Sequence, residues 1–205
     1  GHVTGVQTCA LPISDHAAVA IEHARLFERE QDRRRQLEAI RDVSYEITRE
    51  LDLSRLLQLI WHRAAALVDG DRGALFLWDD EAQELHASVW PECFDEVRSV
   101  RLKPGEGAAG TVAQTRQGLV LNDYRSWPQA LAHFVEVSPT IAYMVEPVLY
   151  QDRLIGVIGV GRSESGRPFT RSDQETLRLF GQHAAVAIEN ARLFDQEQRR
   201  RRQVE

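Results

Sequence analysis

The sequence predicts an α+β fold, in which the middle of the chain forms one antiparallel sheet and the two ends form helices. Runs of β-prone residues follow one another between residues 73 and 160, whereas the segment 15–50 contains neither Pro nor Gly. Turns of three or four residues join neighbouring strands, and such short turns require antiparallel pairing. The composition, 43% hydrophobic and 27% charged in 205 residues, is that of a globular chain. These observations favour segregated helices over a doubly wound parallel sheet.

Three segments are expected to be helical at the ends of the chain. Apolar residues recur at steps of three or four through 15–50, which predicts one long helix. A second helix is expected after Asp52 and Ser54, both good N-cap residues, and it ends near residue 70. The last helix is expected to run from about residue 173 to the end of the chain.

The strands are expected between these helices. A short helix at 108–116 and a mixed segment of loop and helix at 122–137 interrupt them. The β-prone runs are 73–78, 85–90, 97–102, 119–121, 141–150 and 154–160.

An internal repeat is the most informative feature of the chain. The segment HAAVAIEHARLFEREQDRRRQLE, which begins at His16, recurs from His183 as HAAVAIENARLFDQEQRRRRQVE, and the two copies are identical at most positions, polar ones included. An amphipathic pattern restricts the apolar positions but not the identity of each polar one, so the repeat indicates duplication. The parent protein is therefore expected to be a tandem array. Segment 15–50 would contain the last helix of a preceding module and a connector, 51–176 the core of a complete module, and 177–205 its own last helix.

The opening segment 1–14, GHVTGVQTCALPIS, differs from the rest of the chain. It carries no helical or strand period and no basic region typical of a signal peptide. It resembles the adapter-derived translations found at the ends of gene fragments, and the absent initiator Met agrees with a truncated chain. We expect 1–14 to be non-native, with a disordered native linker as the alternative.

Composition excludes several classes of function. A formal charge of −6 gives no general attraction to nucleic acid, so no nucleic-acid partner is expected. Only Cys9 and Cys93 are present, which excludes a disulfide framework and favours a reducing, cytoplasmic location. No apolar run approaches the roughly 20 residues that span a bilayer, so no membrane contact is expected. No catalytic triad or metal-ligand spacing is present, and we expect neither an enzyme nor a metal site.

Three segments together carry a family resemblance. LKPGEGAAGTVAQTRQGLVLNDYRSWP from Leu102, the hairpin VLYQDRLIGVIGV from Val148 and the ending PFTRSDQETLRLFGQHAAVAIENARLF from Pro168 resemble a GAF domain over about residues 51–194. The resemblance implies a GAF-like central antiparallel sheet with helices on both faces. The first, second and last helices would pack on one face, and a small-molecule pocket would lie under the shorter helices on the other.

The resemblance also implies a function. GAF modules of this type lie in series between the input and output domains of bacterial sensor histidine kinases and cyclic-dinucleotide enzymes, usually as parallel dimers. We therefore expect a regulatory module that senses an unknown small molecule and transmits through coiled-coil helices in signal transduction, such as a two-component system. A ligand-free dimerisation spacer in the same array is the alternative.

The ligand pocket is expected around the segment 122–134. Aromatic, histidine and carboxylate side chains lie close together there, and pockets combine apolar walls with a few polar groups. The alternative is that Asp123 caps a turn and Trp127 belongs to the core. The candidate ligand-binding residues are Phe76, Trp78, Asp123, Tyr124, Trp127, His133, Phe134 and Tyr143.

A glycine pattern at 105–110 matches the GxGxxG of dinucleotide-binding loops. That site needs a buried parallel strand before the loop, whereas 97–102 is half polar and Pro104 follows it. A tight turn with close helix packing is the preferred interpretation.

The resemblance raises several cofactors that the residues disfavour, and the cofactor stays unknown. No bilin is expected because no Cys lies near the pocket helix, and free methionine sulfoxide reductases, which are enzymatic relatives, need a set of reactive thiols. Haem on His133 is disfavoured, because a lone helical His is more often a packing or surface residue. The cyclic-nucleotide motif is incomplete: Phe169 and Asp173 match it, but Gly161-Arg162 replaces Asn-Lys and Gln174 replaces Glu. An exposed Arg162–Asp173 ion pair, worth about 0–1 kcal/mol, is the simpler interpretation.

The terminal helices are expected to form a homodimer. Two parallel helices can bury apolar stripes together, and packing on the chain's own sheet is the alternative. We expect both, with the sheet covering 177–188 and a partner covering the outer turns. Adjacent signalling domains of the full-length protein are the other expected partners. The stripes are Leu37, Ile40, Ile47 and Leu51 in the first helix, and Leu177, Phe180, Ala184, Ile188 and Ala191 in the last.

Overall fold

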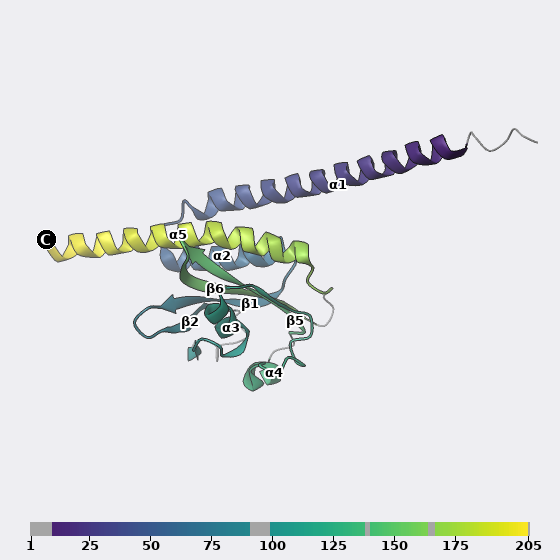
Figure 1. The fold of residues 1–205 in the computed structure, drawn as a ribbon. Helices are drawn as coiled ribbons and strands as arrows, with labels where there is room; N and C mark the ends of the chain where they lie inside the picture. The colour runs from purple at the N-terminus through teal and green to yellow at the C-terminus, as the bar shows by residue number, and fades with distance from the viewer. Residues whose placement is uncertain (1–9, 91–98, 138–139, 164–166, 205) are drawn as a thin grey trace, which may run out of the picture. The chain divides into compact units, whose positions relative to one another are not determined.

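A computed structural model describes residues 10–90, 99–137, 140–163 and 167–204 (Figure 1). The chain divides into two compact units, 1–39 and 40–205, and each is described by itself. In the part of the chain that the structure describes, no helix is long and apolar enough to cross a membrane.

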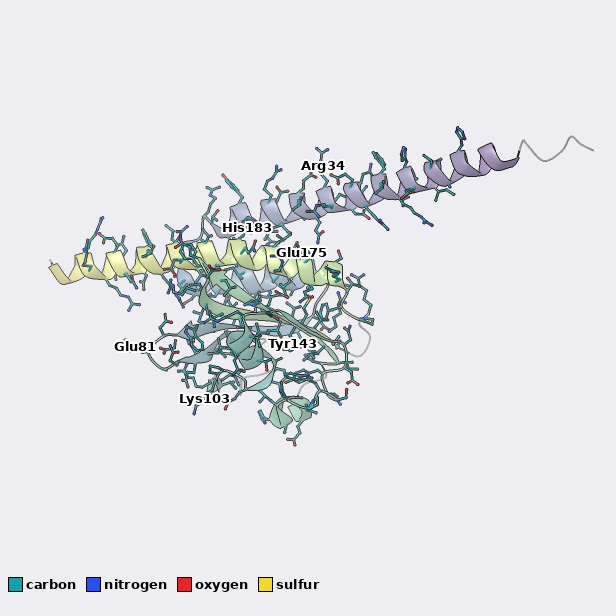
Figure 2. The ribbon with its side chains drawn as sticks, in the orientation of Figure 1. Arg34, Glu81, Lys103, Tyr143, Glu175 and His183 are labelled. Atoms are coloured by element: carbon teal, nitrogen blue, oxygen red, sulfur yellow. The ribbon has the colours of Figure 1, made fainter. Side chains whose placement is uncertain are left out.

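The first unit consists of the N-terminal part of helix α1 (Ala10–Ile47). The helix begins five residues before the start that the sequence predicts. Pro12 lies in the first turn, where a missing backbone N–H costs little. All side chains from residue 16 to residue 35 are exposed, and Figure 2 shows them projecting from the helix, Arg34 among them.

The second unit contains a six-stranded sheet in which all paired strands are antiparallel, as expected. The strand order is β3-β2-β1-β6-β5-β4. The strands are β1 (Arg72–Asp79), β2 (Glu84–Val89), β3 (Arg101–Leu102), β4 (Leu119–Leu121), β5 (Ala142–Tyr150) and β6 (Arg153–Arg162).

Helices cover both faces of the sheet, as the sequence predicts (Figure 1). On one face, α2 (Leu53–Leu67) and α5 (Arg171–Val204) enclose a core that includes Ile47 and alternate residues of the central strands. On the other face, α3 (Gly107–Thr115) and the segment around α4 (Ala132–Val137) enclose a second core. The period of two along β1 divides the strand between them: Leu75 and Leu77 belong to the first core, and Phe76 to the second.

Local capping explains where the two long helices of the module begin. The Asp52 carboxylate accepts a hydrogen bond from the Arg55 amide at 2.9 Å, so Asp52 is the N-cap of α2. Thr170 and Asp173 exchange bonds at the start of α5: the Thr170 amide donates to the carboxylate at 2.8 Å, and the Asp173 amide donates to the hydroxyl at 3.2 Å. This capping box starts α5 two residues earlier than expected.

The glycine loop at residues 105–110 forms a tight turn and packs closely against its neighbours, which is the interpretation that the sequence favoured over dinucleotide binding. The loop follows β3, a two-residue antiparallel edge strand, and the Gly105 amide donates to the Gly110 carbonyl at 2.8 Å. Gly107 has φ +61°, and a Cβ on Gly110 would lie 2.4 Å from the Lys103 carbonyl oxygen. The strand expected at 97–102 is found only at Arg101–Leu102; residues 97 and 98 lie outside the described part of the chain, and 99–100 are not strand.

The expected stripes of the terminal helices are mostly buried in their own module. In α5, every stripe residue from Leu177 to Ala191 is buried. We expected the sheet to cover the helix only as far as residue 188, so the buried stripe extends three residues further. Near the end of α1, Ile40 and Ile47 are also buried, whereas Leu37 and Leu51 are exposed.

Candidate ligand site and its link to the last helix

Four of the predicted pocket residues form one aromatic cluster on the α3 and α4 side of the sheet. The Tyr124 ring lies 6.2 Å from the Trp127 ring, 6.2 Å from the Phe134 ring and 5.6 Å from the Tyr143 ring, centroid to centroid. Phe134 also lies 6.4 Å from Tyr143. These rings come from the loop after β4, from α4 and from β5. The cluster therefore joins the most irregular part of the module to its central sheet.

Two tyrosine hydroxyls belong to this cluster. Tyr124 and Tyr143 are both buried, and burial raises the pKa of each phenol, so both stay protonated at neutral pH. Tyr143 is labelled in Figure 2. The Tyr124 hydroxyl accepts a hydrogen bond from the Leu131 amide at 3.3 Å. The Tyr143 hydroxyl lies so close to Gly159 that a Cβ there would be 2.0 Å from it. The site offers aromatic walls and neutral hydroxyl groups, which suits an uncharged or planar small molecule.

The other four predicted residues do not join the cluster. Phe76 and Trp78 lie in the same core on β1, and the Trp78 indole donates to Asp80 at 2.9 Å. Asp123 is exposed and accepts a hydrogen bond from the Ser126 amide at 3.3 Å, which is the turn-capping role given as its alternative. His133 is exposed on α4.

Asn122 lies in the segment that was expected to form the pocket, but the sequence did not indicate its role. Its side-chain amide donates to the Phe169 carbonyl at 3.2 Å and its side-chain oxygen accepts from the Phe169 amide at 2.8 Å. Asn122 thus ties the loop that carries Tyr124 to the residue just before the cap of α5. No local pattern indicates this pair, because the partners are 47 residues apart in sequence.

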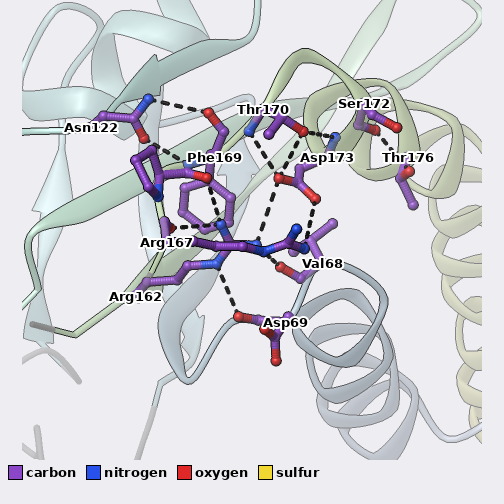
Figure 3. Close-up of polar contacts among 11 residues, drawn as sticks. Val68, Asp69, Asn122, Arg162, Arg167, Phe169, Thr170, Ser172, Asp173 and Thr176 are labelled. Atoms are coloured by element: carbon purple, nitrogen blue, oxygen red, sulfur yellow. Dashed lines mark hydrogen bonds and ion pairs between the residues drawn. The ribbon is translucent and has the colours of Figure 1, made fainter. Parts of the chain in front are cut away.

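Arg162 holds the other side of the same junction (Figure 3). Its guanidinium donates to the carbonyls of Val68 and Asp69 at the end of α2, and to the carbonyls of residues 167 and 168 before α5. It also lies 3.9 Å from the centre of the Phe169 ring and 3.7 Å from the Asp173 carboxylate. The expected Arg162–Asp173 pair is present, but the expectation that it is exposed is wrong: the side chains are 3% and 12% exposed.

The family is decided by a comparison with known domain families. The sequence profile of the GAF domain matches residues 52–188, from the N-cap of α2 to the middle of α5. The chain belongs to the GAF domain family. GAF domains are regulatory modules that sense small molecules in signalling proteins.

Other proteins that contain GAF domains are similar to this chain. A probable 3′,5′-cyclic phosphodiesterase of Caenorhabditis elegans is 25% identical over 173 residues, which are 78% of this chain and 23% of that protein. A Nif-specific regulatory protein of Herbaspirillum seropedicae is 26% identical over 166 residues, 78% of this chain and 30% of that protein. The chain spans less than a third of the length of either relative.

A solved structure shares the fold. The GAF domain of a phosphoenolpyruvate-protein phosphotransferase from Coxiella burnetii superposes with a TM-score of 0.68 at 22% identity, over 78% of this chain and 96% of that one. At this identity the likeness concerns the fold alone.

A charged cleft of about 320 Å³ lies on the α5 side of the GAF sheet. Arg153, at the start of β6, binds Glu189 of α5 at 2.7 Å and lies 3.7 Å from Asp80 in the β1–β2 turn. His86 faces the same cleft, and burial, followed by the charge of Arg101, lowers its pKa, so the imidazole is neutral at pH 7. Arg153 therefore links the β1–β2 turn and the start of β6 to α5 at this cleft.

No group of three or more acidic, histidine or cysteine side chains in the described part of the chain is arranged to hold a metal ion.

Proposed function

We propose that this GAF module senses a small molecule at the aromatic cluster and transmits its binding to α5. The observation that carries the proposal is the pair of hydrogen bonds between Asn122 and Phe169. Asn122 lies two residues before Tyr124, and Phe169 lies directly before the Thr170 cap of α5. A shift of the aromatic loop is therefore passed to the first turn of α5 through a short, rigid path.

The mechanism requires two arrangements of the aromatic loop. In the described arrangement the rings of Tyr124, Phe134 and Tyr143 contact one another, so a ligand enters by separating them. A ligand shifts the equilibrium only by the difference between its affinities for the two arrangements, and a coupling of about 1–3 kcal/mol is typical of regulation. Arg162 keeps the ends of α2 and α5 together, so the two helices respond as one body.

The output of the module is proposed to be mechanical. We propose that α5 and α1 form coiled-coil contacts in a parallel homodimer and connect the module to adjacent signalling domains of a cytoplasmic protein, such as a histidine kinase. Support comes from large apolar side chains that stay exposed on α5 although the module covers its other face: Val186, Leu193 and Phe194.

A ligand-free dimerisation spacer is the second candidate function. It is favoured by the contacts among the same rings, because a core of touching aromatic side chains is stable without a ligand. Its output helices would be the same. The two candidate functions differ in whether the aromatic rings of the cluster ever separate to admit a ligand.

Native mass spectrometry of the protein purified from its host separates the two candidates. A sensor is expected to retain a small molecule, seen as a second mass that disappears on denaturation. The Asn122→Ala variant is expected to keep that molecule but to lose the difference in amide hydrogen exchange between loaded and emptied protein at the start of α5. Asn190→Ala, at an exposed position of α5, is the matched control and should keep the difference. A chain that never carries a second mass and gives one exchange pattern would be a spacer.

A further inference from the structure

We infer that residues 17–25 of α1 are the docking face for the sheet of another GAF module, which precedes them in the native polypeptide. The inference is independent of whether the aromatic cluster binds a ligand. It rests on the exposure of the two copies of the repeated segment: one face of the copy in α5 is buried, whereas the copy in α1 is exposed.

In α5 the repeated segment is docked. Ala184, Ala185, Ala187, Ile188 and Ala191 are each at most 2% exposed and belong to the core between α5, α2 and the sheet. Small side chains on this face let the helix backbone approach the sheet closely. Glu189, beside this face, receives a hydrogen bond from Arg153 at 2.7 Å.

In α1 the equivalent residues are exposed. Ala17, Ala18, Ala20, Ile21 and Ala24 are identical to the five buried residues of α5, in the same order and spacing, and all are exposed. Ile21 is 54% exposed, whereas its counterpart Ile188 is fully buried. Glu22 repeats Glu189 and is exposed as well. The sequence of α1 thus carries a complete docking face without the surface that it fits.

A second face of the helix provides an internal control. Three large apolar residues are exposed in α5 although the module is present, and their counterparts are exposed in α1 too: Val186 and Val19, Leu193 and Leu26, Phe194 and Phe27. A module therefore buries one face of this helix and leaves the other open. The burial of the two copies differs on the alanine-rich face, which is the face that a missing module would cover.

The docked copy also defines the chemistry of the partner. The partner offers an aliphatic sheet face, a basic residue at the start of its last strand to bind Glu22, and an acidic residue in a neighbouring turn that holds that base, as Asp80 holds Arg153. A second copy of this chain offers such a surface, but its own α5 already occupies it. An upstream module in the same polypeptide is therefore the occupant that fits.

The first experiment compares equivalent substitutions in the 205-residue chain by thermal unfolding. Ala185→Leu inserts bulk between α5 and the sheet and is expected to lower the melting temperature by several degrees. Ala18→Leu, at the equivalent exposed position, is expected to leave the melting temperature and the sedimentation coefficient unchanged. If Ala18→Leu changes either property here, the face is already covered by this chain or by a second copy, and the inference is wrong.

The second experiment uses the native polypeptide extended upstream of residue 15. In that polypeptide, unfolding of the upstream module should give an additional thermal transition. Ala18→Leu is expected to lower the melting temperature of this upstream transition, just as Ala185→Leu lowers the melting temperature of the downstream transition. His23→Asn, which is a natural difference between the two copies at an exposed position, should leave both transitions unchanged. Amide hydrogens of 17–25 should exchange slowly in the extended polypeptide and fast in the 205-residue chain. Equal exchange in the two proteins, or the absence of an upstream transition, would overturn the inference.

Discussion

At the scale of single residues, the junction between α2, β6 and α5 depends on one guanidinium. Arg162 satisfies carbonyl groups at the C-terminal end of α2, which the helix leaves without intrahelical partners, and it also binds the carbonyls of residues 167 and 168 before α5. No other side chain type presents five donors in a fixed planar arrangement. The charge is balanced by the Asp173 carboxylate, so the buried group is both paired and hydrogen-bonded.

Replacing Arg162 by lysine should therefore be strongly destabilising. One ammonium group cannot reach all the carbonyls that the guanidinium binds, and we expect Arg162→Lys to lower the free energy of unfolding by about 2–4 kcal/mol. Urea denaturation measures this change. Arg167→Lys is the matched control, because Arg167 is 62% exposed and lies 3.6 Å from the same carboxylate; its effect should stay below about 1 kcal/mol. Equal effects of the two variants would contradict the assigned role.

Glu146 gives the module a pH dependence. Its side chain is buried on β5, and burial raises its pKa above the ordinary 4.5, although a hydrogen bond from Gln174 at 2.8 Å and the charge of Arg178 act in the opposite direction. Glu175 adds repulsion. The folded state therefore keeps its proton to a higher pH than the unfolded state. The free energy of unfolding falls as the pH rises from about 4.5 through the folded pKa, and it stays lower above that pKa.

Glu146→Gln should remove this dependence of the free energy of unfolding on pH. We expect the variant to be more stable than the parent at pH 7 and equally stable below pH 4.5, where both side chains are neutral. Denaturation at a series of pH values checks the prediction. Glu175→Gln, at an exposed position (Figure 2), should reduce this pH dependence only slightly, because repulsion from Glu175 is the smallest cause of the raised pKa of Glu146. A Glu146→Gln variant that is less stable at pH 7 would show that the carboxylate is needed in its charged form.

Local sequence signals predict some of these residues and miss others for a physical reason. Four of the eight predicted pocket residues lie together because aromatic side chains concentrate in one loop and the strand beside it. The role of Asn122, the role of Glu146 and the burial of Arg162 were missed, because the partners of these residues are 47, 28 and up to 94 residues away in sequence. Such contacts arise only after the chain has folded.

At the scale of elements, most boundaries follow from signals within a few residues. The β1–β2 turn is closed by the Asp79 carboxylate, which accepts from the amides of Glu81 and Ala82 at 2.9 and 3.0 Å. Helices α2 and α5 start at side-chain caps that the sequence displays. Within the described residues β3 is shorter than predicted: it pairs with β2 only at Leu85 and His86, although β2 continues to Val89.

The continuous helix α1 makes a prediction about transmission in the full-length protein. Inserting four residues after Arg35 rotates the following residues by about 40° beyond one full turn, at about 3.6 residues per turn. We expect the insertion to abolish ligand-dependent output. An insertion of seven residues keeps the heptad phase to within about 20° and should preserve the output. Normal output with four inserted residues would indicate a flexible tether instead of a rigid helix.

At the scale of the whole molecule, the exposed apolar residues of α5 predict self-association. Leu193→Glu places a charge in the middle of this face and should convert a dimer into a monomer without lowering the melting temperature of the module, because Leu193 is 56% exposed. Analytical ultracentrifugation at micromolar concentrations measures the change. Arg199→Gln, on an exposed turn of the same helix, should remain dimeric. A parent protein that already sediments as a monomer would contradict the proposed dimer.

The repeated helix also has a genetic consequence. The copies that begin at His16 and His183 are identical at most positions, so a crossover that joined the coding segment of one copy to that of the other in register would delete or add the length of one module. The product keeps an uninterrupted helix, and it keeps the alanine-rich face that each sheet needs, because that face is the same in both copies. Proteins built in this way can change their number of modules in a single genetic step, and each product keeps a helix that fits every sheet.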